Sequence, residues 1–182
     1  MIPTTHALFD EARAHWQRQA ERHPGGLPHA CDLKPEEMAA WMPDTLLVEL
    51  DRRLFDFRFS LVGTRVVAFY GIEFTGRTLT QLPFPLDWNN ETTFWTWWNF
   101  VECPRPTQTT AQHLLAPGCP VVLDRLVLPY AGRTAARPRL MVLQRARLES
   151  FAGSLAAARL ASERRIERRA RSRPTLRTPS AA

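Results

Sequence analysis

Apolar and polar residues alternate most clearly near the middle of the chain. Leu54–Leu61 places phenylalanine or leucine at every second position from Phe55 onward, with Asp, Arg and Ser between them, which is typical of a half-buried β-strand. Thr45–Asp51 predicts a partner strand, and the short link between the two predicts a hairpin. Thr64–Tyr70 then predicts a short helix.

Weaker periodic patterns predict the remaining elements. Thr5–His23 has a weakly amphipathic helical pattern with a polar outer face, and Pro and Gly residues end it. Asp32 is expected to cap a short helix that runs to Trp41. Glu91–Glu102 predicts an unusually aromatic helix. Three further strands are predicted at Thr107–Leu115, Val121–Tyr130 and Arg139–Arg147.

These elements together predict an α+β fold. Five strands, with helices inserted between the second and third, indicate an antiparallel sheet with helices crossing one face. An N-terminal helix would precede the sheet, and a C-terminal basic helix with a tail would follow it. The expected division is residues 1–31 for the N-terminal helix and linker, 32–149 for the domain, and 150–182 for the basic extension.

The charge of the chain is concentrated at its C-terminal end. The net charge is +6, and the sequence from Arg159 onward holds eight arginines and two glutamates, which account for the whole excess. The rest of the chain is neutral overall and gives no electrostatic reason to expect a nucleic-acid-binding face. The sequence has no apolar run of about 20 residues that could span a bilayer and no apolar N-terminal signal segment, so we expect a cytoplasmic protein.

Residues that could support catalysis or metal binding are scarce. The three cysteines form no CxxC pair, and His23, His29 and Cys31 make a metal cluster only with a fourth ligand that the sequence does not show. No phosphate-binding loop or nucleophile motif is present, so we expect neither a metal nor an enzyme. Asp51 and Asp56 flank the predicted hairpin turn and are expected to be solvated.

A set of short motifs between Asp32 and Glu149 resembles a known signature. In order, these are Trp41-Met42-Pro43, Leu61-Val62-Gly63-Thr64, Tyr70-Gly71, Thr75-Gly76-Arg77, Arg105-Pro106 and Arg125-Leu126-Val127-Leu128-Pro129-Tyr130. The order resembles that of the PAS domain family, and of its small single-domain bacterial members in particular. The glycines Gly63, Gly71 and Gly76 are expected to adopt backbone angles that other residues avoid.

The resemblance implies a sensory or regulatory module with a cavity between the sheet and its helices. The aromatic candidates for the cavity wall are Phe69, Tyr70, Phe94, Trp97 and Trp98. Aromatic residues at helical spacing can equally form a filled core. No cysteine lies in the setting that flavin-binding members use, and Glu91–Glu102 has no histidine for haem, so the resemblance predicts no cofactor.

Two kinds of partner follow from the sequence. As a PAS-like module the chain would bind a small molecule or a protein of a signalling pathway, through the cavity or the outer sheet face, and Leu8 to Trp16 could support a homodimer. The alternative is an adaptor for nucleic acid or an anionic membrane that acts through the arginine-rich tail. The tail candidates are Arg164, Arg165, Arg168, Arg169, Arg171 and Arg173.

Overall fold

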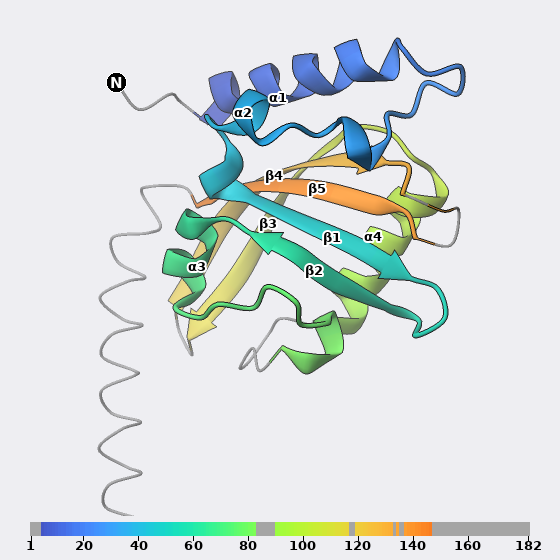
Figure 1. Cartoon of the computed structure of the whole chain (residues 1–182). Coiled ribbons are helices and arrows are strands. Elements are labelled where there is room, and N and C mark those ends of the chain that lie inside the picture. Colours follow the sequence, from blue (N-terminus) through green and yellow to red (C-terminus); the bar gives the residue numbers. More distant parts are fainter. Residues whose placement is uncertain (1–4, 83–89, 117–118, 133, 135–136, 147–182) are drawn as a thin grey trace, which may run out of the picture.

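The computed structural model describes residues 5–82, 90–116, 119–132, 134 and 137–146. Its centre is one antiparallel sheet with the strand order β2-β1-β5-β4-β3 (Figure 1). The strands are β1 (Thr45–Asp51), β2 (Asp56–Val62), β3 (Thr107–Ala116), β4 (Cys119–Tyr130) and β5 (Arg139–Ala146). The helices are α1 (Thr5–Ala20), α2 (Pro35–Met38), α3 (Thr64–Tyr70) and α4 (Asn90–Glu102), with 3-10 turns η1 (Ala30–Asp32), η2 (Met42–Asp44) and η3 (Leu79–Gln81). The predicted α+β architecture is confirmed.

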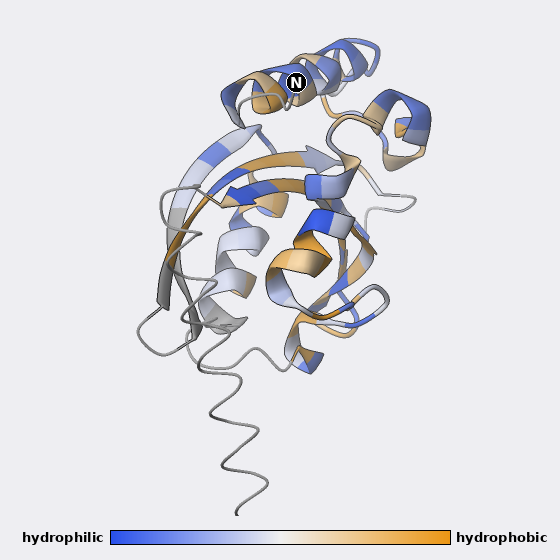
Figure 2. Cartoon of the chain, turned by 90° about the vertical axis from the view of Figure 1, so that its left-hand side faces the viewer, coloured by the Kyte–Doolittle hydropathy of each residue, from blue (hydrophilic) through white to orange (hydrophobic). Residues whose placement is uncertain are grey.

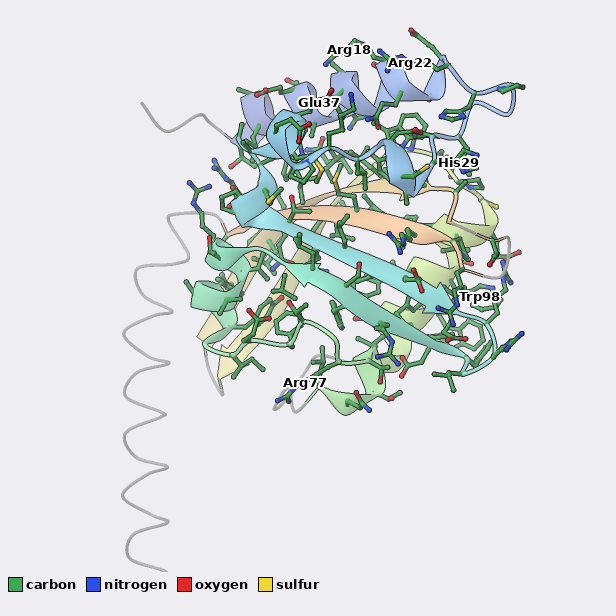
Figure 3. All side chains as sticks on the ribbon, viewed as in Figure 1. Arg18, Arg22, His29, Glu37, Arg77 and Trp98 are labelled. Carbon is green, nitrogen blue, oxygen red and sulfur yellow. The ribbon has the colours of Figure 1, made fainter. Side chains whose placement is uncertain are left out.

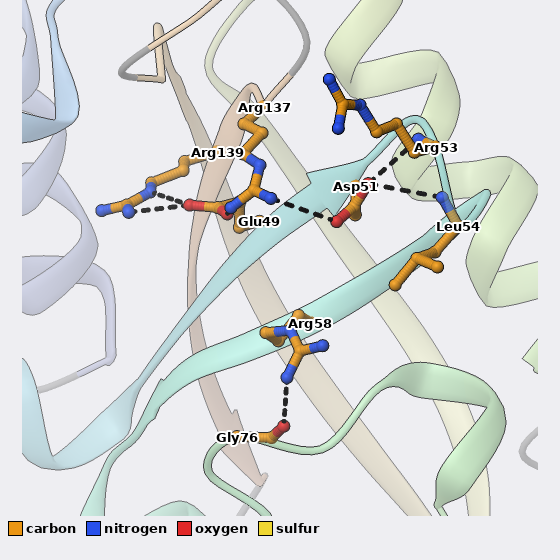
Figure 4. A network of polar contacts seen from close by, with 8 residues as sticks. All are labelled: Glu49, Asp51, Arg53, Leu54, Arg58, Gly76, Arg137 and Arg139. Carbon is orange, nitrogen blue, oxygen red and sulfur yellow. Dashed lines mark hydrogen bonds and ion pairs between the residues drawn. The ribbon is translucent and has the colours of Figure 1, made fainter.

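The β1–β2 hairpin is closed by the side chain of Asp51. Its carboxylate accepts hydrogen bonds from the backbone N–H groups of Arg53 and Leu54, at 3.0 and 3.3 Å (Figure 4). Arg137, next to β5, lies 3.5 Å from the same carboxylate and so ties the turn to the neighbouring strand. The next residue in the turn, Phe55, has a φ of 51°, a left-handed conformation that side chains other than Asn, Asp and Gly seldom adopt.

One face of the sheet, here called the inner face, is covered by α3 and α4. Alternate residues of the strands point toward it, because side chains along a strand alternate between its two faces. The buried residues of this face are Leu46, Val48, Leu50, Phe57, Phe59, Val127, Leu140 and Val142. They pack with Phe94 and Trp97 of α4 and Val66 of α3 into one hydrophobic cluster.

The opposite face, here called the outer face, is covered by α1. Leu8, Phe9 and Trp16 are buried there in one cluster with sheet residues such as Leu128 and Met141. Figure 2 shows α1 lying above the sheet with many hydrophilic residues. Full burial of a leucine or phenylalanine contributes about 1.5–3 kcal/mol, so the weak amphipathic pattern is enough to hold α1 on the sheet.

Two of the three glycines in the predicted signature have the expected backbone angles. Gly71 has a φ of 72° and Gly76 a φ of 83°, which confirms the prediction for these two. The expectation for Gly63 is wrong, because its φ of −66° is open to any residue. Its constraint is steric: a Cβ on Gly63 would lie 2.4 Å from the carbonyl oxygens of Met42 and Pro43.

Two expectations about aspartates are also wrong. Asp32 does not cap the short helix, which begins at Pro35 after Lys34; its carboxylate instead accepts a hydrogen bond from the backbone N–H of His29 at 3.0 Å. Asp56 is buried, not solvated. Its carboxylate accepts hydrogen bonds from the N–H of Phe57 at 2.7 Å and from the Thr80 hydroxyl at 2.6 Å, which replace the lost water.

Within the described residues, no helix is long and apolar enough to cross a membrane. The predicted basic helix and tail after residue 149 lie outside those residues. The division of the chain at residues 31 and 149 stays a prediction.

Candidate functional site

Aromatic side chains form a continuous line of rings across the inner face. Trp97 of α4 packs against Phe57 and Phe59 of β2, with ring centroids 5.4 and 5.8 Å away. Phe59 packs on Phe74 at 4.9 Å, and Phe74 lies 5.9 Å from Tyr70 at the end of α3. Most of these pairs are edge-to-face, the geometry that aromatic rings favour in packed interiors. The line therefore joins α4 to α3 through the sheet.

The five predicted cavity residues lie on the two helices that cover this face. Phe94 and Trp97 are buried and pack on the sheet, while Trp98 is partly exposed at the end of α4 near the β1–β2 hairpin (Figure 3). Phe69 and Tyr70 are partly buried, and their rings lie 4.9 Å apart at the end of α3. The structure thus brings Tyr70 and Trp97 to one face of the sheet. That they line a ligand cavity stays a prediction.

A polar cluster lies at the α3 end of the same face. Arg125 of β4 and Gln144 of β5 are directly paired across the two strands, and their exposed fractions are only 8% and 5%. The Tyr70 hydroxyl lies close to both side chains. Burial raises the pKa of Tyr70, while Arg125 and Gln144 act in the opposite direction. We call these three residues the inner polar cluster.

Gln144 is the member of this cluster with unused hydrogen-bonding capacity. Its Oε1 atom is buried and accepts no hydrogen bond from any residue within the described ranges. Buried polar atoms in native proteins nearly always have a partner, which makes this oxygen a candidate for contact with a bound group or water. Glutamine also offers an N–H donor, so this side chain could both accept from and donate to a ligand.

Sequence reasoning missed Arg125 and Gln144, although the chain carried a signal for both. In β4, Arg125 has the same parity as the buried residues Leu123 and Val127. In β5, Gln144 has the same parity as Leu140 and Val142. A polar residue at an apolar position of a strand is the pattern that could have identified the cluster.

The N-terminal histidines lie near each other and near Asp32. His23 Nε2 lies 2.7 Å from the Asp32 carboxylate, and the rings of His23 and His29 are 4.9 Å apart. Cys31 is exposed. Across the described part of the chain, no three histidine, cysteine or acidic side chains are placed to hold one ion.

The outer face is occupied by the chain's own N-terminal helix. The predicted homodimer contact at Leu8 to Trp16 is not tested by a single chain, but both residues are buried against the sheet. His15 is buried in the same layer, with Nε2 3.7 Å from the Glu37 carboxylate. Burial lowers the pKa of His15, and the negative charge of Glu37 only partly opposes this effect. The outer face is therefore not a free docking surface while α1 is in place.

A second candidate surface is an exposed apolar patch at the hairpin tip, formed by Leu54, Phe55 and Trp95 and here called the hairpin patch. Their exposed fractions are 60%, 51% and 48%, the large exposed apolar residues of the described chain. The Phe55 ring packs on Trp98 at 5.1 Å, and the Arg52 guanidinium lies 5.1 Å from the Trp98 ring. Contiguous exposed apolar groups of this kind are typical of contact surfaces.

The arginine candidates of the tail, Arg164 to Arg173, lie outside the described residues.

The chain is similar to one protein family and to several solved structures. A family model described as PAS domain matches residues 4–142. No curated protein matches the sequence. Among solved structures, the PAS domain of an HTR-like protein from Haloarcula marismortui is 14% identical, with 78% of this chain and 97% of that chain covered and a TM-score of 0.39. A LOV protein of Rhodobacter sphaeroides is 16% identical, with 85% and 75% covered and a TM-score of 0.42. A LOV photoreceptor domain from a fungus is likewise 16% identical, with 58% and 76% covered and a TM-score of 0.39.

Proposed function

This chain belongs to the PAS domain family, and from that premise we propose that it is a non-catalytic regulatory module that binds a small molecule on the inner face of its sheet. The observation that carries the proposal is the buried Gln144 amide, whose oxygen accepts no hydrogen bond from the described residues. A ligand that donates a hydrogen bond to this oxygen would replace the missing partner.

The surroundings of Gln144 favour one kind of ligand. Arg125 places a positive charge beside the amide, and the rings of Tyr70, Phe74 and Phe59 extend from the cluster along the inner face. A molecule with a flat apolar body and a polar group that both donates and accepts hydrogen bonds suits this arrangement. Aromatic carboxylic acids and nucleobases have that chemistry.

Helix α4 could carry the signal from the inner face to a protein partner. It holds Trp97 buried against the sheet and Trp95 exposed in the hairpin patch, on opposite sides of one rigid helix. A ligand that displaced Trp97 would move Trp95 as well, because packed helices shift as units. Such a ligand shifts α4, and with it the hairpin patch, only if it binds the protein more tightly with the helix in one position than in the other. The hairpin patch is the proposed contact for the partner.

The proposal is tested by replacing Gln144. Thermal unfolding is measured with a panel of aromatic carboxylic acids, purines and pyrimidines for the native chain, for Gln144→Leu and for Gln108→Leu. Gln108 is an exposed glutamine on β3 and serves as the matched control. We expect at least one compound to raise the melting temperature of the native chain and the control but not of Gln144→Leu. Equal shifts in all three chains, or none in any, contradict the proposal.

The charge distribution supports a second function, that of an adaptor for nucleic acid or an anionic membrane. The whole excess charge of +6 lies from Arg159 onward, so only that segment offers the electrostatic attraction that such partners require. Removal of this segment separates the two functions, since the residues named for the inner face all precede it in the sequence.

A further inference from the structure

An open apolar pocket lies between α2, η2, the end of β2 and the start of α3. Its volume is about 540 Å³, within the range of about 300–1,000 Å³ that is common for pockets that hold a small molecule. It is lined by Pro35, Glu36, Ala39, Met42, Pro43, Leu61, Val62, Gly63 and Thr64. We call it the α2–β2 pocket.

Strand β5 ends beside this pocket. Arg145, one residue before the end of β5, contacts the Asp44 carboxylate of η2 at 3.2 Å, and Met42 and Pro43 of the same turn line the pocket. Leu143 is paired with Thr45, the residue that follows η2. The described part of the chain therefore ends at Ala146 beside η2, and 36 residues follow β5 in the sequence.

The sequence after β5 contains apolar residues that match the apolar lining of the pocket. Leu148, Phe151 and Leu155 are spaced three and four apart, which places them on one face if the segment is helical. Phe151 is five residues from Ala146, a reach of about 8 Å in a helix and at most about 17 Å in an extended chain.

The charges at the pocket and at the start of the following segment are of opposite sign. Glu36 at the pocket rim has no ion-pair partner among the residues the structure describes, and Arg147 is the first residue after β5. We propose that Leu148, Phe151 and Leu155 occupy the α2–β2 pocket of the same chain.

If these three residues occupied the α2–β2 pocket, the sequence after them would leave the domain at one fixed place. The arginines from Arg159 onward would then start from one defined corner of the fold, next to η2. A partner that competes for the pocket would release this segment, so the pocket would control the position of the basic tail. This inference does not depend on ligand binding at the inner face.

The first test compares amide NMR spectra of the full chain and two variants. Phe151→Glu places a charge on the apolar face of the segment, whereas Ala157→Glu places one on the opposite face of the same helical pattern and serves as the control. We expect the amide signals of Val62, Gly63 and Thr64 to move in Phe151→Glu and to stay in place in Ala157→Glu. Unchanged signals at these residues in Phe151→Glu would overturn the proposal.

The second test identifies the occupant by disulfide trapping. Ala39→Cys and Ala152→Cys are combined in a chain whose native cysteines are replaced by serine, and the control pairs Ala152→Cys with Arg53→Cys at the far end of the β1–β2 hairpin. We expect the first pair to form a disulfide within one chain at least tenfold more than the control pair. Equal yields, or cross-links only between two chains, would overturn it; the latter result would show that a second copy supplies the segment.

Discussion

Substitution of Gly63 tests how closely the end of β2 packs against η2. Gly63 follows β2 and begins α3, and its N–H donates a hydrogen bond of 2.7 Å to the carbonyl of Thr45. A Cβ at this position would meet the carbonyl oxygens of Met42 and Pro43 at 2.4 Å, closer than real Cβ contacts come. Both atoms belong to the backbone of η2, so a side chain cannot simply turn away. Gly63→Ala must move η2 relative to β2.

The expected loss of folding free energy follows from this displacement of η2. Overpacking typically destabilises a protein by about 1–3 kcal/mol, and a backbone clash belongs at the upper end, so we expect about 3 kcal/mol for Gly63→Ala. For a domain of this size that corresponds to a fall of roughly 6–12 °C in melting temperature. Thermal and urea unfolding followed by circular dichroism measure both quantities.

Two other glycines make a graded control series. Gly71 has open space around it but a φ of 72°, so Gly71→Ala should cost only the left-handed backbone penalty of about 1–2 kcal/mol. Gly25 has open space and an ordinary backbone, so Gly25→Ala should leave stability unchanged or slightly raised. A Gly63→Ala chain that unfolds within about a degree of the native chain, or a larger loss of stability in Gly71→Ala, would show that a Cβ at position 63 does not displace η2.

Three further outcomes are expected. Burial lowers the pKa of His15 below 6.5, so as the pH falls this histidine is protonated in the unfolded chain before it is protonated in the folded chain. The free energy of unfolding should therefore fall as the pH drops below about 6.5. Urea midpoints at pH 7.5 and 5.5 should therefore differ less in His15→Gln; an equal difference contradicts this. Trp16→Phe removes the 2.7 Å bond from Nε1 to the Pro129 carbonyl and should cost about 1–2 kcal/mol in the same assay, whereas no change would show the bond to be unimportant. Deleting Arg159–Ala182 should abolish any salt-dependent binding to DNA, RNA or anionic vesicles measured by anisotropy or sedimentation, and retained binding would exclude the tail as its source.

The helices and strands of the fold could be predicted from the sequence. Phe55–Leu61 alternates strictly, and glycine at positions 71 and 76 matches the two left-handed turns found there. The family could be identified because its short motifs occur in a fixed order. These features are local, so they can be recognised without knowledge of what each strand packs against.

The features that were missed depend on contacts between distant parts of the chain. Asp56 is buried because Thr80, 24 residues later, donates a hydrogen bond to it. Gly63 is constrained by the carbonyls of η2, not by its own angles. Arg125 and Gln144 meet because β4 and β5 pair in one register, which strand prediction does not supply. The aromatic residues of α4 were identified, but their packing on Phe57 and Phe59 was not.

Mass spectrometry of the purified full chain can show whether the inner face holds a small molecule. The mass is recorded under native and denaturing conditions, for the native sequence and for Gln144→Leu, with an absorbance spectrum of each sample. We expect extra mass on the native chain that is lost on denaturation and is reduced or absent in Gln144→Leu. A native chain at its bare mass, or extra mass equal in both proteins, would contradict this expectation.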